Sequence, residues 1–197
     1  MSSPRTAEVK RKTRETDIRL VLNLDGSGKS KIKVGVGFFE HMLTALAKHG
    51  RMDIELTCKG DLHIDEHHTV EDVGIVLGQA LAKAIGDKAG LNRFSEAFAP
   101  LDEALSRVVV DLSGRGFLVF RGNLGREKVG DLSTELVEDF WRAVATKAGI
   151  TMHMEILYGI NAHHQVESLF KAAARAIHTA TRIVSGVEGV PSTKGVL

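Results

Sequence analysis

The chain has 197 residues, of which 43% are hydrophobic and 26% are charged, with 26 basic and 25 acidic side chains. This composition excludes global disorder, and the near-neutral charge excludes the strongly basic surface that nucleic acids attract. Cys58 is the only cysteine, which excludes an intramolecular disulfide and a cysteine-based zinc site. No apolar run reaches the roughly 18 residues of a membrane span, and the basic start MSSPRTAEVKRKTRET has no apolar signal segment. We therefore expect a cytoplasmic protein that binds neither nucleic acid nor membranes and acts on a small molecule.

The first half of the chain is predicted to contain four strands and two helices. Alternating apolar residues predict strands at 8–12, 17–24 and 31–36, and GSGK at 26–29 is typical of a hairpin turn. A helix is predicted from Phe39 to about His49, and Gly50 suits its C-terminal end. A strand at 53–59 and an apolar-faced helix that follows His67 complete this half.

The second half repeats this order. Strands are predicted at 97–100, 107–111 and 117–121, and SGRG at 113–116 again resembles a hairpin turn. A helix from 136 to about 148 ends at Gly149, a strand follows at 151–158, and a second helix follows His163.

The strongest sign of an internal repeat is a pair of short segments about half the chain apart. HHTVED at 67–72 matches HHQVES at 163–168, and each opens a helix rich in alanine and aliphatic residues. We predict an internally duplicated α+β fold in which each half is a four-stranded sheet with two helices on one face. The two repeats, about 1–95 and 96–190, are expected to form a single compact catalytic domain, followed by a C-terminal tail at 191–197.

The two repeated segments have the composition of metal sites. Residues four apart on a helix share one face, whereas adjacent residues diverge by roughly 100°. His67 and Glu71 can therefore hold one ion, while His68 points toward a second ion or another copy of the chain. Because His68 and Glu71 are also compatible at a spacing of three, which histidine of each pair faces which ion stays open. Imidazole and carboxylate without thiolate suit manganese, iron or zinc.

A lone histidine pair more often caps a helix or lies in solvent than binds metal. Two copies, each with glutamate three residues after the second histidine, favour metal binding instead. His41, in the helix start GFFEHML, is predicted to join these ligands because the duplicated layout brings it near a cluster.

Several cationic positions are predicted to bind an anion, although each alone could be a solvated charge. Arg93 lies in LNRF, Arg115 in SGRG, and Ser192, Thr193 and Lys194 in PSTKG, where hydroxyls, a lysine and a glycine can surround a phosphate. PLDEAL at 100–105 places two carboxylates in an apolar run. These are either supports for metal-bound imidazoles or part of a plain strand edge.

Taken together, several motifs resemble the imidazoleglycerol-phosphate dehydratase family from about Val9 to the C-terminus. They are GFFEHML, DEHHTVED, NRF, PLDEAL, DLSGR, GINAHHQVESLFKAAARAI and PSTKG. The resemblance implies a fold like domain 2 of ribosomal protein S5. It also implies a lyase of histidine biosynthesis that removes water from D-erythro-imidazole glycerol phosphate to give imidazole acetol phosphate. The resemblance further implies two Mn²⁺ ions per active site, which bind the imidazole or imidazolate ring of the substrate. It also implies a homo-oligomer, a 24-mer of trimers with sites between subunits.

The resemblance also implies roles for individual residues. Glu15, Glu71 and Glu167 would be catalytic, with Glu15 moving protons, and Arg93, Arg115, Ser192, Thr193 and Lys194 would bind the substrate phosphate. The implied manganese ligands are His41, His67, His68, Glu71, His163, His164 and Glu167. Asp139 stands in LVEDF where many family members have histidine, which makes it the candidate for an eighth ligand.

Two other functions remain open from the residues alone. A dinuclear hydrolase of phosphate esters would use a similar set of histidines, carboxylates and cations, but it would release inorganic phosphate. A structural oligomer held together by metals would dissociate on chelation and turn over no small molecule.

Overall fold

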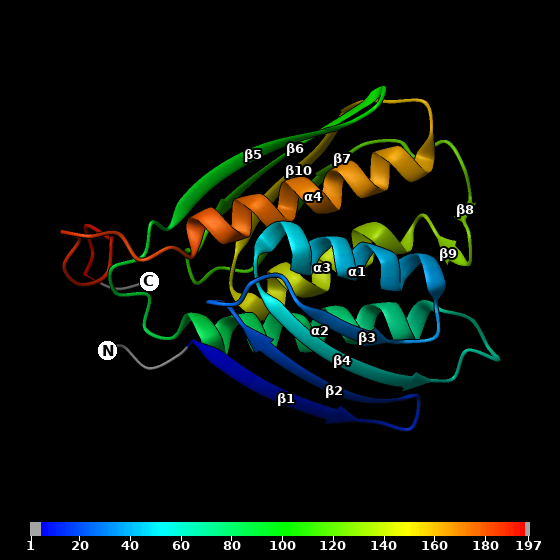
Figure 1. The fold of residues 1–197 in the computed structure, drawn as a ribbon, viewed down its shortest axis with the longest axis horizontal. Coiled ribbons are helices and arrows are strands. Elements are labelled where there is room, and N and C mark those ends of the chain that lie inside the picture. Colours follow the sequence, from blue (N-terminus) through cyan, green and yellow to red (C-terminus); the bar gives the residue numbers. More distant parts are fainter. Residues whose placement is uncertain (1–4, 196–197) are drawn as a thin grey trace.

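The computed structural model describes residues 5–195 and consists of two four-stranded sheets with four long helices between them (Figure 1). The first half contains β1 (Thr6–Lys12), β2 (Thr16–Asn23), β3 (Ser30–Lys33), α1 (Gly37–Gly50), β4 (Asp53–Gly60) and α2 (His67–Ile85). The second half contains β5 (Phe94–Leu101), β6 (Ala104–Asp111), β7 (Phe117–Arg121), β8 (Lys128–Val129), β9 (Leu132–Ser133), α3 (Leu136–Ala148), β10 (Thr151–Tyr158) and α4 (Ala162–Ala180).

Both sheets have the same strand order, which confirms the duplicated α+β fold. The first sheet runs β1-β2-β4-β3 and the second β5-β6-β10-β7. In each sheet the last edge strand, β3 or β7, is parallel to its neighbour, and the other pairs are antiparallel. A single contiguous core joins both halves, while residues 196–197 of the predicted tail lie outside the described residues.

The two predicted hairpin turns are wrong. The segment 26–29 connects β2 to β3, and 113–116 connects β6 to β7, but neither pair of strands is hydrogen-bonded to each other. In each half the strand that follows the first helix of that half, β4 or β10, lies between them. The turn residues resemble those of hairpins because the chain changes direction there, whereas strand pairing is decided by a segment further along the chain.

The helices pack across the boundary between the two repeats. The long helices α2 and α4 each cover the sheet of their own half, whereas α1 packs against α4 and α3 against α2 (Figure 1). Glycines permit the close approach of α2 to α3, since a Cβ at Gly74 would lie 2.8 Å from the carbonyl oxygen of Phe140. Between the helices, the ring of Phe140 lies 5.2 Å from that of Phe39 and 5.6 Å from that of Phe170. Side chains from opposite repeats are thereby brought to a common position.

Within residues 5–195, no helix combines the length and apolar character needed to cross a membrane.

Candidate functional site

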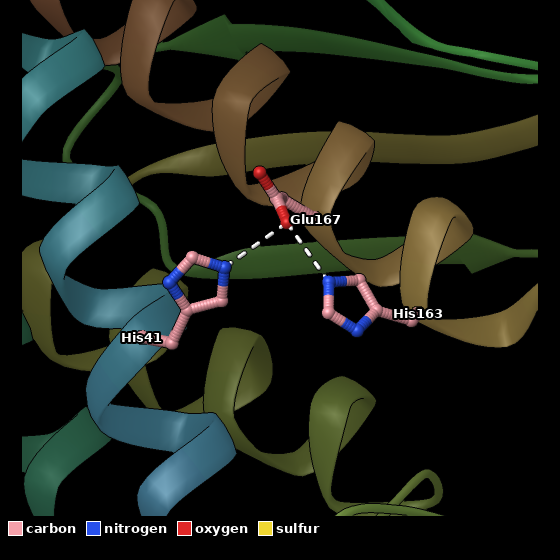
Figure 2. A group of neighbouring side chains, drawn as sticks. All are labelled: His41, His163 and Glu167. Atoms are coloured by element: carbon pink, nitrogen blue, oxygen red, sulfur yellow. Dashed lines mark hydrogen bonds and ion pairs between the residues drawn. The ribbon is translucent and has the colours of Figure 1, made fainter.

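The beginning of α4 places two predicted ligands on one face. Asn161 caps this helix, and its Oδ1 accepts a hydrogen bond of 2.9 Å from the backbone N–H of His163. With the helix fixed at this point, His163 and Glu167 lie one turn apart and point in the same direction. Their side chains face α1, the neighbouring helix from the other repeat (Figure 2).

His41 of α1 completes a group of three donors with His163 and Glu167 (Figure 2). One carboxylate oxygen, Glu167 Oε2, lies 3.1 Å from His41 Nε2 and 3.0 Å from His163 Nε2. Adjacent ligands of an octahedral ion with bonds of about 2.1 Å are separated by about 3.0 Å, so the spacing fits a first-row metal. In the described part of the chain this is the only group of three such donors within 4.8 Å of one another.

Glu167 is held as a carboxylate by its neighbours. Its side chain is only 13% exposed, and burial alone would raise its pKa, but hydrogen bonds from Lys171, His41 and His163 outweigh burial and lower the pKa to about 2. Lys171 lies one turn further along α4, with its Nζ 2.7 Å from Glu167 Oε1. One oxygen of Glu167 is thus bound by lysine, and the other faces the two imidazoles.

The second histidine of each pair points elsewhere, as helical geometry predicts. The ring planes of His163 and His164 are 82° apart, and those of His67 and His68 are 88° apart. His164 Nδ1 lies 2.7 Å from Glu103 Oε2, and His68 Nδ1 lies 3.0 Å from Asp61 Oδ2. The adjacent carboxylates raise the pKa of both histidines.

These contacts leave one nitrogen of each second histidine available. An ionised carboxylate only accepts hydrogen bonds, so Nδ1 carries the hydrogen and the neutral ring keeps its lone pair on Nε2. Glu103, from the PLDEAL motif, thus lies beside an imidazole, which is one of the two roles considered for that motif. Hydrogen bonds from His164 and from two backbone amides lower its pKa to about 2. Asp61 was not predicted, although it lies a few residues before the first histidine pair in the sequence.

Carboxylates also lie on the Nε2 side of both second histidines. Glu15, in the turn between β1 and β2, has its Oε1 3.7 Å from His68 Nε2. Asp102, in the turn between β5 and β6, has its Oδ2 3.8 Å from His164 Nε2. The duplicated fold therefore gives Glu15 a counterpart in Asp102, one of the two carboxylates of the PLDEAL motif.

The first cluster is less complete within one chain. His67 Nε2 lies 3.9 Å from Glu71 Oε2, and both side chains are about half exposed. Asp139 occupies the position on α3 that corresponds to His41 on α1, but within residues 5–195 it joins no group of three donors. Its side chain instead lines a cavity of about 440 Å³ beside Leu124 and Glu138. This leaves the proposed role of Asp139 as a ligand a prediction.

All five predicted phosphate-binding residues line one cavity of about 410 Å³. These residues are Arg93, Arg115, Ser192, Thr193 and Lys194, and Ser113 and Gly114 complete the lining. Ser113 was missed as a single residue, although it belongs to the DLSGR motif. The cavity therefore combines two guanidinium groups, an ammonium group and hydroxyls, which suits an anion.

Arg93 fixes the tail against the second sheet. Its Nε lies 2.8 Å from Asp111 Oδ1, and its Nη1 donates a 2.7 Å hydrogen bond to the carbonyl oxygen of Pro191. Arg115 is exposed at the rim. Arg93 thus has a structural role as well as a charge, while Arg115 is free to face a ligand.

The cavity and the three-donor group lie at opposite ends of α4. The backbone N–H of Arg93 bonds to the carbonyl of Ala180, the last residue of this helix, whereas His163 is in its first turn. A helix of 19 residues spans about 28 Å. A small ligand held at one end therefore does not reach the other end of the same chain.

Comparisons with known proteins identify the family to which the chain is similar. A model of the family described as imidazoleglycerol-phosphate dehydratase matches residues 34–177. The imidazoleglycerol-phosphate dehydratase of Acetivibrio thermocellus is 58% identical over 98% of this chain and 99% of its own length. The one from Gluconacetobacter diazotrophicus is 55% identical over the full length of both. The crystal structure of the Staphylococcus aureus enzyme superposes with a TM-score of 0.83 at 40% identity, over 91% of this chain and 99% of that one.

Proposed function

Because the chain belongs to the imidazoleglycerol-phosphate dehydratase family, and is thus a hydro-lyase of histidine biosynthesis, we propose that it uses two Mn²⁺ ions to act on D-erythro-imidazole glycerol phosphate. The observation that carries the metal proposal is the convergence of His41, His163 and Glu167 within 4.8 Å. The ligands of the two ions are His41, His67, His68, Glu71, His163, His164 and Glu167, with Asp139 as the candidate for an eighth.

The reaction explains why such a site is needed. The proton to be removed lies on a carbon that bears only a hydroxyl group, so it is weakly acidic, and hydroxide is a poor leaving group. Two ions held by these ligands would bind the imidazole ring of the substrate and favour its deprotonated form, from which the hydroxyl on the neighbouring carbon would leave more readily. Glu71 and Glu167 supply carboxylate oxygens beside the imidazole ligands.

Glu15 moves the proton in this proposal. Its carboxylate lies on the Nε2 side of His68, at 3.7 Å, in a turn exposed to solvent. The carbon attached to the ring loses its hydroxyl, and a carboxylate at this position can take the proton from the adjacent, hydroxyl-bearing carbon. The same carboxylate can then return a proton to the ring-bearing carbon as the resulting enol becomes the ketone.

The cationic cavity holds the phosphate. Arg115 and Lys194 are exposed and line the cavity, Ser192 and Thr193 add hydroxyl groups, and Arg93 keeps the tail in place through Pro191. Since the cavity is about one helix length from the three-donor group of the same chain, the metal end and the phosphate end of one substrate belong to different copies.

The outer faces of the two sheets support an oligomer. The first sheet exposes charges paired on its surface, such as Arg19 with Glu8 and Glu55. The second exposes apolar side chains at Phe94, Phe98, Val109 and Phe117. An apolar sheet face of this kind is typical of contacts between subunits. It supports the proposal of a homo-oligomer, for which the family implies a 24-mer of trimers.

The direct test is to add Mn²⁺ to metal-free protein and measure product formation. Imidazole acetol phosphate is expected to appear from imidazole glycerol phosphate on addition of Mn²⁺, with no release of inorganic phosphate. Phosphate release would instead indicate a hydrolase. A protein that assembles with Mn²⁺ but forms no product would have only a structural metal.

A second test asks whether the site is shared between copies. His163→Ala removes a metal ligand and Arg115→Met a phosphate contact, so each variant alone should be inactive or weak. If the two variants are dissociated, mixed in equal amounts and reassembled, about one quarter of the sites regain both intact ends. Activity that stays at the level of the separate variants would place both ends in one chain.

A further inference from the structure

One segment of the second repeat has no counterpart in the first. Residues 34–36 connect β3 to α1, whereas the corresponding connection from β7 to α3 spans 122–135 and contains the hairpin β8–β9. Since the shorter connection makes the same step from edge strand to helix, the fold does not require the longer one. The side chains of the hairpin indicate what it adds.

Asp131, at the tip of this hairpin, caps helix α1 of the other repeat. Its Oδ2 accepts a 2.6 Å hydrogen bond from the backbone N–H of Gly37, and its Oδ1 a 3.0 Å bond from that of Phe38. The residue before the helix is Val36, whose side chain cannot accept a hydrogen bond. The first free N–H groups of α1 are thus satisfied by a carboxylate from the second half of the chain.

The base of the hairpin is attached to the beginning of α2. Glu66 is 8% exposed, and its Oε1 accepts hydrogen bonds from the backbone N–H of Ser133 at 2.9 Å and from its hydroxyl at 2.5 Å. Lys128 Nζ lies 3.2 Å from the same oxygen. Glu66 directly precedes His67, so one hairpin holds the first turns of α1 and α2 together.

The capped turn of α1 leads to the three-donor group. The ring of Phe38, whose N–H is bound by Asp131, lies 4.9 Å from the ring of His163. His41 follows Phe38 by about one helical turn and projects to the same side as that ring, 5.9 Å from the ring of His163. A shift of this turn would therefore move His41 relative to the ligands on α4.

We propose that the hairpin β8–β9 is a brace between the repeats that sets His41 against His163 and Glu167, with Asp131 as the main positioning residue. Through Glu66 the same hairpin fixes the helix end that carries His67. This inference rests on the proposed metal site. It assigns Asp131 a role in metal affinity, although Asp131 contacts none of the ligands.

The test compares Asp131→Ala with Asp53→Ala by Mn²⁺ titration of metal-free protein. Asp53 is a matched control because its Oδ1 also accepts two backbone N–H bonds, from Ser27 at 2.9 Å and Lys29 at 2.8 Å, in a turn that carries no proposed ligand. Asp131→Ala is expected to weaken Mn²⁺ binding about tenfold, in the range of supporting residues around metal sites. Asp53→Ala should leave the affinity unchanged while lowering thermal stability to a similar extent.

Asp131→Asn keeps one carbonyl acceptor and should recover part of the affinity. It also serves as the test variant if Asp131→Ala does not fold. The hairpin would be a purely structural element if both variants at Asp131 bound Mn²⁺ with wild-type affinity. The same would follow if Asp53→Ala lost as much Mn²⁺ affinity as Asp131→Ala. If the wild-type protein binds no Mn²⁺ at all, the proposed metal function itself fails, and the brace fails with it.

Discussion

The two histidine clusters share one sequence pattern but differ in how complete they are within a single chain. His163 and Glu167 meet His41 from α1, and the side chain of Glu167 is only 13% exposed and is kept ionised by its neighbours. His67 and Glu71 are 3.9 Å apart and about half exposed, and within the described residues they gain no third donor. The difference arises from the partner helix, because α1 offers an imidazole to α4 where α3 offers Asp139 to α2.

A repeated motif therefore does not guarantee a repeated site. Duplication places the two clusters on equivalent helices with equivalent second histidines, each bound at Nδ1 by a carboxylate. Completion of each cluster then depends on one residue of the neighbouring helix, which is free to diverge. In the proposed oligomer, the first cluster would therefore depend more on what another copy of the chain supplies.

The largest expected effect comes from removing the ligand carboxylates. Glu167→Gln and Glu71→Gln should each lower the dehydration rate by at least about 10³-fold, as for residues that act as a unit. Glu167→Gln should cost more Mn²⁺ affinity, because Glu167 Oε2 contacts two imidazoles in one chain. Both quantities can be measured by steady-state assay and Mn²⁺ titration, with Glu55→Gln as a control of similar exposure to Glu71. A greater loss of affinity in Glu71→Gln would reverse the comparison.

Asp139 is the residue that could make the two clusters equivalent. We expect Asp139 to bind metal in the assembled protein. Asp139→Ala should therefore lower the affinity for Mn²⁺ by about ten- to a hundredfold. Glu138→Ala is the matched control, since the neighbouring Glu138 is bound to Arg142 on the surface of the same helix. Wild-type Mn²⁺ binding by Asp139→Ala would remove Asp139 from the ligand set.

The sequence predicted most of the fold because the relevant patterns are local. Helix ends and alternating strands depend on nearby residues, and each element could be recognised in both repeats. Gly149 ends α3 in the left-handed conformation as predicted, whereas α1 includes Gly50 and Arg51 takes that conformation instead. The strand pairing predicted from the turns at 26–29 and 113–116 was wrong, because a strand further along the chain inserts between the two strands that each turn connects. The β8–β9 hairpin was missed because 122–135 has no apolar alternation.

The site shows the same division between local and distant interactions. The five residues predicted to bind phosphate come from three separate motifs, and the fold brings them to one cavity. Lys171 was missed although its spacing from Glu167, one turn of helix, is visible in the sequence. The contacts of Asp131 with α1 could not be predicted, because they join segments of opposite repeats without a local signal.

A smaller effect is expected from the carboxylates behind the second histidines. Glu103→Gln should weaken Mn²⁺ binding roughly tenfold, since it loosens the orientation of His164 and its hydrogen on Nδ1. Asp61→Asn should do the same at His68, where the contact is longer. Mn²⁺ titration of the two variants compares the clusters directly. If both variants bound Mn²⁺ as tightly as the wild-type protein, the two carboxylates would stabilise only the turns in which they lie.

The smallest expected effects concern buried contacts one residue after each cluster. In the first repeat Asp72 accepts hydrogen bonds from Arg11 and from Thr16 Oγ1, and the Thr16 contact is 2.5 Å long. In the second repeat the corresponding Ser168 shares a 2.7 Å hydrogen bond with Ser106. Ser168→Ala should therefore lower the free energy of unfolding by about 1 kcal/mol, as for a neutral hydrogen bond.

Thr16→Val should lower the free energy of unfolding slightly more than Ser168→Ala, because the acceptor of the Thr16 hydrogen bond is a charged carboxylate. Urea unfolding of the two metal-free variants at the same protein concentration measures both losses. The two variants should also differ in catalysis. Thr16 follows Glu15 in an exposed turn, where its side-chain contact helps to fix the backbone, whereas Ser168 follows Glu167 inside helix α4, where helical hydrogen bonds already do so. A fall in kcat for Thr16→Val, with Ser168→Ala unchanged, would tie the buried Asp72 to the placement of Glu15. If both variants kept full kcat, the asymmetry between the two contacts would concern stability alone.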